Sequence, residues 1–388
     1  MSVITCRAPC NIAVIKYWGK RDEALILPTN DSISITIDMR EMYAETTVMI
    51  SQDFKEDRIW LNKKEEDIKN PRLQNCLNEI KKRSNLPGHM NDWKVRICSI
   101  NSFPTAAGLA SSAAGYACLT AALAKLYKVE GDISSIARSG SGSACRSVMG
   151  GFVRWYMGSD KHGADSFAKE IAPSSHWPEL RALLIIVNSE RKKISSTIGM
   201  RRSMETSEFL QHRIANVVPE RADKMERAII EKDFKIFAEL TMKDSNQIHA
   251  VCLDTYPPCT YMNDISYSIA DFVHSYNDAV DDVKVAYTYD AGPNATLYLM
   301  EEDLPAVIGA LDHFFPPPED NTVLYKRGLR IEETKPSQEL LEKLKFRKHS
   351  PGQFEYTICS KVGDGPVYLK THLLNDQGIP LFEYNKSS

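Results

Sequence analysis

The segment Ala286-Tyr-Thr-Tyr-Asp290-Ala-Gly-Pro-Asn-Ala295 joins an aromatic, β-branched run to a carboxylate and a Gly-Pro turn. Such a run is typical of a strand, and Gly292-Pro293 marks the turn that ends it. An acid at the end of a strand, beside a turn, is well placed to act as a base or to stabilise charge. Taken alone, Asp290 could also be ordinary turn chemistry, because aspartate is common in turns.

A segment rich in small residues lies upstream and has the composition of a phosphate-binding loop. Residues 104–115 read Pro-Thr-Ala-Ala-Gly-Leu-Ala-Ser-Ser-Ala-Ala-Gly, and a long alanine-rich helix is predicted over 110–127. Small side chains let a phosphate approach the backbone, and the N–H groups of the first helical turn supply positive charge. Ser111 and Ser112 add hydroxyls, although the Gly-Lys-Ser/Thr ending of a Walker A loop is absent. The alternative interpretation is an alanine-rich helix packed closely against a sheet.

Three further segments carry cations or hydroxyls at the ends of predicted elements. Residues 140–147 read Gly-Ser-Gly-Ser-Ala-Cys-Arg-Ser, and the fork of Arg146 suits a carboxylate or a diphosphate. Lys16 follows the apolar strand predicted over 11–15, so it either lines a cleft or snorkels to solvent. Residues 191–199 offer cations and hydroxyls after a buried strand. The plainer alternatives are a structural ion pair for Arg146 and an ordinary charged loop at 191–199.

The composition excludes several classes of protein. The chain has 388 residues, 26% of them charged, and a net charge of −3, so it lacks the basic footprint that nucleic-acid binding requires. Nine cysteines without a CxxC pair predict reduced thiols rather than a disulfide framework, and their spacing predicts no zinc site. No apolar run reaches the roughly 20 residues of a membrane span, and the N-terminus lacks the plan of a signal peptide. We therefore expect a cytoplasmic protein that contacts neither nucleic acid nor membrane.

The order of predicted elements indicates an α+β fold. Residues 32–38 alternate strictly and predict a strand with one solvent-facing side, with 42–50 as its hairpin partner. Residues 53–72 are charged and predict an exposed loop or an insertion at a sheet edge. Residues 204–250 are mostly helical, with a break at Pro219.

Strands and helices interleave without regular βαβ spacing, which favours α+β over α/β. The first part of the chain is rich in β-structure and glycine loops, and about 70 helical residues follow. A chain of this length suits two domains of roughly 100–200 residues each. We predict a boundary near residue 180, which gives domains of 1–180 and 181–388.

Taken together, five segments resemble the mevalonate diphosphate decarboxylase family of the GHMP kinase superfamily. The glycine-serine loop alone indicates only the superfamily, whereas the first, third and last segments are much more specific. The resemblance spans almost the whole chain, and its segments, in order, are residues 11–22, 104–114, 140–147, 195–200 and 290–294.

This resemblance implies a fold, an assembly and a reaction. The N-terminal half is expected to resemble the second domain of ribosomal protein S5, and the C-terminal half to be ferredoxin-like, with the active site in a cleft between them. The implied protein is a cytosolic homodimer of isoprenoid and sterol biosynthesis. The implied reaction converts (R)-5-diphosphomevalonate and ATP to isopentenyl diphosphate, ADP, phosphate and carbon dioxide, through phosphorylation at C3.

The resemblance also assigns roles to residues. Asp290 would lie by the C3 hydroxyl as base or charge partner, Lys16 would neutralise the migrating phosphate and help to keep Asp290 ionised, and Arg146 would orient the substrate carboxylate. The diphosphate end of the substrate would be held by Tyr17, Lys20, Ser141, Ser143 and one of Ser195 and Ser196. The ATP phosphates, with Mg²⁺ at Ser111 and Ser112, would be held by Pro104, Ala106, Ala107, Gly108, Leu109, Ala110, Ser111 and Ser112.

One position departs from the family pattern. The family usually has Asn-Ser-Ser where this chain has Asn30-Asp31-Ser32. An additional acid facing the cleft would weaken the binding of an anionic substrate, so we expect Asp31 to point away.

Two rival functions compete with the decarboxylase. A kinase of the same superfamily that stops at the 3-phosphate would need the same ATP loop but would release no carbon dioxide. A metabolite-binding protein on this scaffold would have no use for a base, so the joint presence of Lys16, Arg146 and Asp290 argues against it. The decarboxylase hypothesis requires these three side chains to converge in space.

Overall fold

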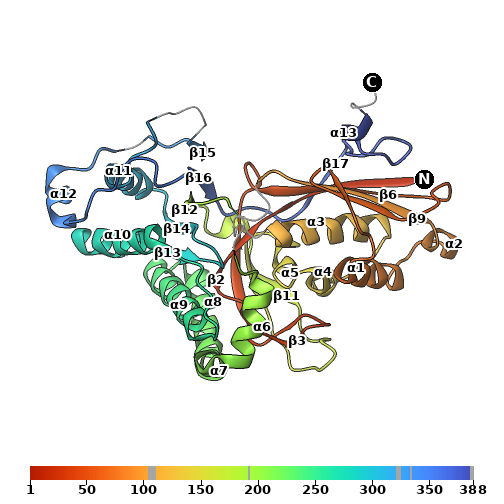
Figure 1. Ribbon diagram of the computed structural model, residues 1–388, viewed down its shortest axis with the longest axis horizontal. Helices are drawn as coiled ribbons and strands as arrows, with labels where there is room; N and C mark the ends of the chain where they lie inside the picture. The colour runs from red at the N-terminus through yellow and green to blue at the C-terminus, as the bar shows by residue number, and fades with distance from the viewer. Residues whose placement is uncertain (104–110, 191–192, 320–324, 333, 385–388) are drawn as a thin grey trace.

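The computed structural model describes residues 1–103, 111–190, 193–319, 325–332 and 334–384. Two halves lie side by side, the N-terminal half in red to yellow and the C-terminal half in green to blue (Figure 1). The predicted α+β class is confirmed, since sheets and helices are mixed in both halves. No helix within these ranges is both long enough and apolar enough to span a bilayer.

The N-terminal half is built on a six-stranded sheet with the order β17-β1-β6-β9-β7-β8. Helix α3 (Ser111–Leu126) packs on β1 and β6 through its alanines, whose small side chains allow close approach. The strands of this sheet are β1 (Ser2–Pro9), β6 (Tyr43–Ser51), β7 (Arg58–Leu61), β8 (Lys64–Glu66), β9 (Lys94–Asn101) and β17 (Val367–Leu369). Shorter helices complete this half: α1 (Pro71–Lys82), α2 (Gly88–Asn91), α4 (Ser134–Gly140) and α5 (Ala144–Ser147).

Strands β7 and β8 lie at one edge of this sheet, where the charged segment 53–72 was predicted to form a loop or an edge insertion. The edge insertion is the correct alternative. The exposed side chains of β8 suit this position, because charge on an edge strand discourages pairing with other chains.

A second sheet, with the order β11-β10-β5-β2, carries the first candidate site residues. Its strands are β2 (Asn11–Ile15), β5 (Ser32–Thr36), β10 (Phe152–Trp155) and β11 (Ala168–Ala172), and a separate two-stranded hairpin joins β3 (Lys20–Asp22) to β4 (Leu27–Pro28).

Two expectations about 32–38 and 42–50 were wrong. Strand β5 pairs with β2 and β10, whereas β6 pairs with β1 and β9, so the two segments form no hairpin. All five residues of β5 are buried, so the strand has no solvent-facing side. The alternation of polar and apolar residues predicted a solvent-facing side because Ser32 and Ser34 are polar. Both hydroxyls instead accept hydrogen bonds from Arg146 inside the protein.

The C-terminal half contains a five-stranded sheet with the order β13-β14-β12-β16-β15. Leu183 and Ile185 of the central strand pack with helices α10 and α11, and Ala182, Leu184 and Ile186 face the core shared with the N-terminal half. The strands are β12 (Leu180–Ile186), β13 (Val285–Tyr289), β14 (Ala295–Met300), β15 (Lys326–Gly328) and β16 (Tyr356–Lys361). The helices are α6 (Ser196–Thr206), α7 (Glu208–His212), α8 (Val218–Glu231), α9 (Phe234–Asp254), α10 (Asp264–Val280), α11 (Leu304–Phe314) and α12 (Gln338–Leu344).

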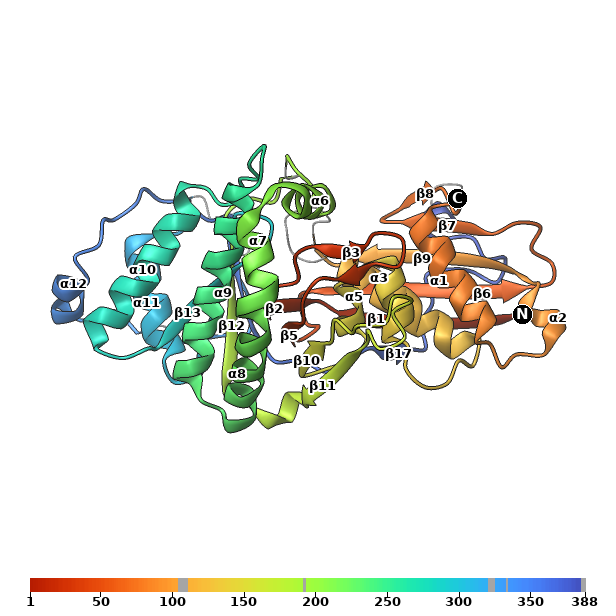
Figure 2. The ribbon, with the colours of Figure 1, turned by 90° about the horizontal axis from the view of Figure 1, so that it is seen from below.

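The predicted helix break at Pro219 lies at the junction between a π-helical segment and helix α8. Residues Arg213–Val217 form a π-helical segment, and α8 then begins at Val218 with the proline in its first turn. Figure 2 shows α8 and α9 side by side, on the side of the C-terminal half that adjoins β2. Helix α9 packs against both β2 and β13, so it contacts strands from both halves.

The end of the chain returns to the N-terminal half. Strand β17 pairs with β1, and helix α13 (Leu381–Tyr384) follows it (Figure 1). The segment before β17 passes close to the segment before β10, and their backbones are in contact. A Cβ added at Gly150 would lie only 2.5 Å from the Gly365 nitrogen, so this close approach requires glycine. The division into 1–180 and 181–388 stays a prediction, and residues late in the sequence contribute a strand to the first sheet.

Candidate active site

An ion pair between the two halves forms the centre of the site. Lys16 directly follows β2, and Asp290 directly follows β13. The Lys16 Nζ lies 2.5 Å from Asp290 Oδ1, and the two side chains are 4% and 31% exposed. The lysine is therefore buried, whereas its carboxylate partner remains accessible to a small molecule.

Arg146 is held in a fixed orientation by buried hydroxyls. It lies on α5 and is 2% exposed. Its Nε donates to Ser34 Oγ at 2.9 Å, and its Nη1 donates to Ser32 Oγ at 2.5 Å. Among the described residues none accepts a hydrogen bond from Nη2, which leaves one side of the fork for an anion. Burial lowers the pKa of Arg146, and the nearby Asp290 carboxylate acts in the opposite direction.

The predicted phosphate-binding residues Tyr17 and Ser141 lie around the same loop. Tyr17 packs on Trp155 with ring centroids 4.7 Å apart, and a Cβ at Gly142 would meet its ring at 2.8 Å, so this loop requires glycine. The buried Tyr17 hydroxyl has no hydrogen-bond partner among the described residues, and burial raises its pKa. An unpartnered phenol that keeps its proton can donate a hydrogen bond to an anion. The Ser141 Oγ lies 3.2 Å from Ser112 Oγ at the start of α3.

The other predicted substrate contacts lie at or next to the ends of elements. Lys20 Nζ lies 2.5 Å from Glu23 Oε2, so an incoming phosphate would compete with that carboxylate. Ser143 immediately precedes α5, and its carbonyl accepts a hydrogen bond from Asn11. Ser195 caps α6 by accepting from the Ile198 N–H at 3.3 Å, and Ser196 is the first residue of that helix.

The predicted ATP loop falls mostly outside the described residues. This applies to Pro104, Ala106, Ala107, Gly108, Leu109, Ala110 and the side chain of Ser111. Ser112 is described and exposed, one residue into α3. Within the described part of the chain, no group of three His, Cys, Asp or Glu side chains could hold a metal ion.

Family models match both parts of the chain. Residues 8–168 match the diphosphomevalonate decarboxylase-like N-terminal domain, and residues 182–369 match the mevalonate 5-diphosphate decarboxylase C-terminal domain. A human protein named diphosphomevalonate decarboxylase is 51% identical, and the match covers 98% of each chain. The chain belongs to the mevalonate diphosphate decarboxylase family. The predicted function, ATP-dependent decarboxylation in the mevalonate pathway, is confirmed by these relatives.

Solved structures of mevalonate diphosphate decarboxylases confirm the predicted fold. The Trypanosoma brucei enzyme is 40% identical with a TM-score of 0.86, and the match covers 95% of this chain and 98% of that one. A structure of MDDEF in complex with MVAPP, AMPPCP and magnesium is 32% identical with a TM-score of 0.74, covering 95% and 99% of the two chains. These matches extend over both halves of the decarboxylase fold.

Sequence reasoning missed two polar residues of this decarboxylase that line the same region. Arg72, in the first turn of α1, donates from Nη2 to Thr197 Oγ1 on α6 at 3.3 Å and so links the two halves. Asn11 donates to Ser147 Oγ at 2.7 Å and accepts from Arg146 Nε at 3.3 Å. Positive charge in the first turn of a helix is unfavourable, because the N-terminal end of the helix dipole is itself positive. The unusual position of Arg72 in the sequence could therefore have marked it as a candidate site residue.

Helix α9 places three further missed residues beneath the ion pair. The fully buried Asp244 accepts the Lys16 backbone N–H at 2.7 Å, and Ser245 accepts the Tyr289 N–H at 2.9 Å. His249 is 7% exposed, and burial together with the charge of Lys16 lowers its pKa to about 4. This imidazole is therefore neutral at physiological pH, and it adds no charge to the site.

The departure at Asp31 is accounted for by its contacts. One carboxylate oxygen accepts from Arg154 Nη2 at 2.7 Å, and the other accepts from the Met157 N–H at 2.7 Å. Arg154 also pairs with Asp223 and Glu226 of α8. Asp31 is thus directed toward Arg154, as expected for a carboxylate that does not oppose an anionic substrate.

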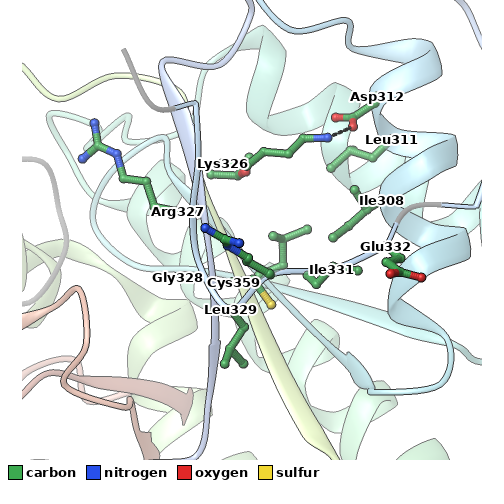
Figure 3. Close-up of a pocket in the computed structure, with 13 residues that line it drawn as sticks. Ile308, Leu311, Asp312, Lys326, Arg327, Gly328, Leu329, Ile331, Glu332 and Cys359 are labelled. Atoms are coloured by element: carbon green, nitrogen blue, oxygen red, sulfur yellow. Dashed lines mark hydrogen bonds and ion pairs between the residues drawn. The ribbon is translucent and has the colours of Figure 1, made fainter.

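A separate cavity of about 480 Å³ lies between α11 and strands β15 and β16 (Figure 3). Its walls combine apolar side chains such as Leu311 and Ile331 with the Lys326–Asp312 ion pair. None of the predicted site residues lines this cavity. It is therefore distinct from the candidate active site.

Proposed function

We propose that this chain carries out its family's reaction at the cluster of Lys16, Arg146 and Asp290. The substrates are (R)-5-diphosphomevalonate and ATP, and the products are isopentenyl diphosphate, ADP, phosphate and carbon dioxide. The observation that carries the proposal is the 2.5 Å contact between Lys16 Nζ and Asp290 Oδ1, together with the buried guanidinium of Arg146, which interacts electrostatically with the same carboxylate. The reaction requires one accessible carboxylate and two cations around one carbon.

The first step makes a leaving group. The tertiary hydroxyl at C3 leaves poorly, so the γ-phosphoryl group of ATP is transferred to its oxygen, and ADP departs. Asp290 lies beside the hydroxyl and takes its proton, a contribution of about 10²–10⁴-fold for a positioned base. Lys16 neutralises charge on the phosphoryl group as it moves.

The second step forms the double bond. The C3–O bond breaks and its electron pair leaves with phosphate, so positive charge develops at C3, next to the Asp290 carboxylate. The C1–C2 bond then breaks, its electron pair becomes the C2–C3 double bond, and carbon dioxide is released. Arg146 orients the carboxylate for this step, and its bonds to Ser32 and Ser34 keep the guanidinium from following the substrate. A tighter grip in the ground state than in the transition state would oppose release.

The diphosphate end is assigned to residues at the ends of nearby elements. The unpartnered hydroxyl of Tyr17 supports its role, as does the position of Ser141 across from Ser112. Lys20, Ser143 and one of Ser195 and Ser196 complete this set. Substrate binding would exchange the Glu23 carboxylate on Lys20 for a phosphate oxygen.

ATP and Mg²⁺ are assigned to the loop at 104–110 and to the hydroxyls of Ser111 and Ser112. The exposed Ser112 at the start of α3 fits this role, because Mg²⁺ prefers phosphate and hydroxyl oxygens and keeps several waters. Bound Mg²⁺ supplies neutralisation of phosphate charge. The MDDEF complex with AMPPCP and magnesium supports this assignment.

The assembly and the compartment follow from the family resemblance. We infer a homodimer that works in the cytoplasm. Light scattering on the purified protein tests the dimer, and fractionation of the cells that make it tests the compartment.

The decisive test of the activity is the stoichiometry of products. The purified protein is incubated with ATP, Mg²⁺ and 5-diphosphomevalonate, and ADP, phosphate, carbon dioxide and isopentenyl diphosphate are quantified. We expect the four products in equal amounts, and none after chelation of Mg²⁺. Formation of ADP without carbon dioxide would identify a kinase that stops at the 3-phosphate, and binding without any product would identify a metabolite-binding protein.

A further inference from the structure

The backbone of Lys16 is bound on both sides by one buried ion pair. Asp244 Oδ2 accepts the Lys16 N–H at 2.7 Å, and Arg213 Nη2 donates to the Lys16 carbonyl at 3.1 Å. Both Arg213 and Asp244 have side chains that are 0% exposed. The lysine belongs to the end of β2, whereas its two partners belong to the helical layer of the C-terminal half.

The pair itself has rigid geometry. Arg213 Nη1 and Nη2 donate to the two oxygens of Asp244 at 2.8 and 3.0 Å, in a fork-to-fork arrangement. Arg221 Nη1 also donates to Asp244 at 2.9 Å, and both arginines donate to Gln247 Oε1. Arg213 begins the π-helical segment Arg213–Val217, a rare conformation that occurs often at functional sites.

Net stabilisation does not explain such a pair well. Removing two charges from water costs about as much as their attraction returns, and apolar side chains of similar volume often stabilise a core at least equally. What apolar residues could not supply is a donor and an acceptor for the two backbone groups of Lys16. The contacts to Lys16 therefore give this buried pair a use beyond stability.

The same helix also holds the partner of Lys16. Ser245, the residue after Asp244 on α9, accepts the Tyr289 N–H at 2.9 Å, and Asp290 is the next residue of that strand end. Two consecutive helical residues thus fix the strand ends that carry Lys16 and Asp290. We propose that Arg213 and Asp244 are positioning residues, which hold Lys16 through its backbone so that its ammonium meets Asp290. This inference rests on the role proposed for Lys16 above.

Positioning and simple structural support predict different kinetics. If Arg213 only supports the fold, its conservative variant loses stability, and the folded fraction turns over normally. If Arg213 positions Lys16, a displacement of about 1 Å at the ammonium lowers kcat by roughly 10- to 100-fold. The KM for diphosphomevalonate should change little, because Arg213 contacts none of the proposed diphosphate-binding side chains.

The test compares the same arginine-to-lysine change at the two arginines that bind Asp244. Arg213→Lys keeps the charge but loses the fork that reaches both Asp244 and the Lys16 carbonyl. Arg221→Lys is the matched control, since Arg221 shares Asp244 and Gln247 but makes no hydrogen bond with Lys16. We expect kcat of Arg213→Lys to fall by roughly 10- to 100-fold, and kcat of Arg221→Lys to stay within about threefold of the wild type. Equal kcat values for the two variants, per folded molecule, would overturn the inference.

A double-mutant cycle separates this inference from the proposed function. In a Lys16→Met background, Arg213→Lys should cost no further activity, because there is no ammonium left to position. Multiplicative losses would overturn the positioning role. A Lys16→Met variant with wild-type kcat would instead overturn the role proposed for Lys16 itself.

A second variant covers the case in which Arg213→Lys does not fold. Asn30 lies in the N-terminal half and donates from Nδ2 to the same Lys16 carbonyl at 3.0 Å. Asn30→Ala should lower kcat by roughly 3- to 10-fold, again with KM for diphosphomevalonate nearly unchanged. An unchanged kcat in this variant would contradict control of Lys16 through its backbone.

Discussion

The buried imidazole of His249 makes the stability of this protein depend on pH in a way that can be calculated. His249 is only 7% exposed, and its Nε2 has no hydrogen-bond partner among the described residues. Burial and the positive charge of Lys16 lower its pKa from 6.5 to about 4, against the opposing effects of Asp290 and the Tyr289 backbone. In the unfolded chain the same imidazole returns to its ordinary pKa.

The sign of the effect follows from proton binding. Between pH 6.5 and 4 the unfolded chain binds a proton at His249 that the folded protein does not, so acid favours unfolding. The stabilisation is fully present above pH 6.5 and is lost as the pH falls toward the folded-state pKa. The complete loss corresponds to about 3 kcal/mol, and lowering the pH from 7 to about 5 loses about 2 kcal/mol of it.

The test substitution is His249→Asn, which removes the titrating imidazole and leaves a small polar side chain. Urea unfolding of the wild type and the variant at pH 7 and pH 5 gives the two free energies of unfolding. Between these pH values we expect the wild type to lose about 2 kcal/mol more than the variant does. His162→Asn, at an exposed histidine, controls for the loss of one imidazole. An identical pH dependence in the wild type and His249→Asn would show that His249 does not have a lowered pKa in the folded protein.

Two further substitutions test the site and the packing around it. Arg146→Ala should lower kcat by about 10²-fold or more while the ATP dissociation constant changes less, as steady-state kinetics and equilibrium titration would show; a larger effect on ATP affinity would misplace Arg146. Gly140→Ala should lower the free energy of unfolding by about 1–3 kcal/mol, because its Cβ would lie 2.1 Å from the Tyr116 ring. Gly115→Ala is the matched control for urea unfolding, since nothing lies within 4 Å of a Cβ there, and equal stability losses would contradict the packing argument.

Part of the geometry of the candidate site was predictable, because the residues concerned lie at recognisable ends of elements. Lys16 and Asp290 both follow strands whose apolar runs are evident in the sequence, and the structure brings Lys16 Nζ within 2.5 Å of Asp290 Oδ1. The glycine-serine segment around Ser141 and Gly142 also lies where small residues are needed, against the ring of Tyr17.

Strand pairing was less predictable because it depends on distant parts of the chain. Strands β5 and β6 are close in sequence and look like a hairpin, yet β5 pairs with β2 and β10, and β6 pairs with β1 and β9. Two of these partners, β9 and β10, lie far along the chain. Strand β17 is short and partly exposed, so no hydrophobic pattern marked it as a partner of β1.

The polar residues of α9 were missed for a different reason. Asp244 lies in a polar stretch that resembles a solvated helix face. Its spacing from Thr241, Ile248 and Cys252, however, places it on the buried stripe of α9, and the structure shows these residues buried. Helical periodicity could therefore have identified a buried acid, although it could not have identified Arg213 as its partner.

In the proposed mechanism, Asp290 acts at the reacting carbon rather than in holding the substrates. Asp290→Asn replaces one carboxylate oxygen by an amide and should leave ATP and diphosphomevalonate binding within about threefold of the wild type, because the loss acts on the transition state. Asp281→Asn is the matched control, since Asp281 is exposed in the left-handed conformation that asparagine also accepts. The measurement is the rate of carbon dioxide release at saturating ATP and diphosphomevalonate. We predict no detectable release by Asp290→Asn and normal release by Asp281→Asn, and a near wild-type rate for Asp290→Asn would show that its carboxylate is not needed at the reacting carbon.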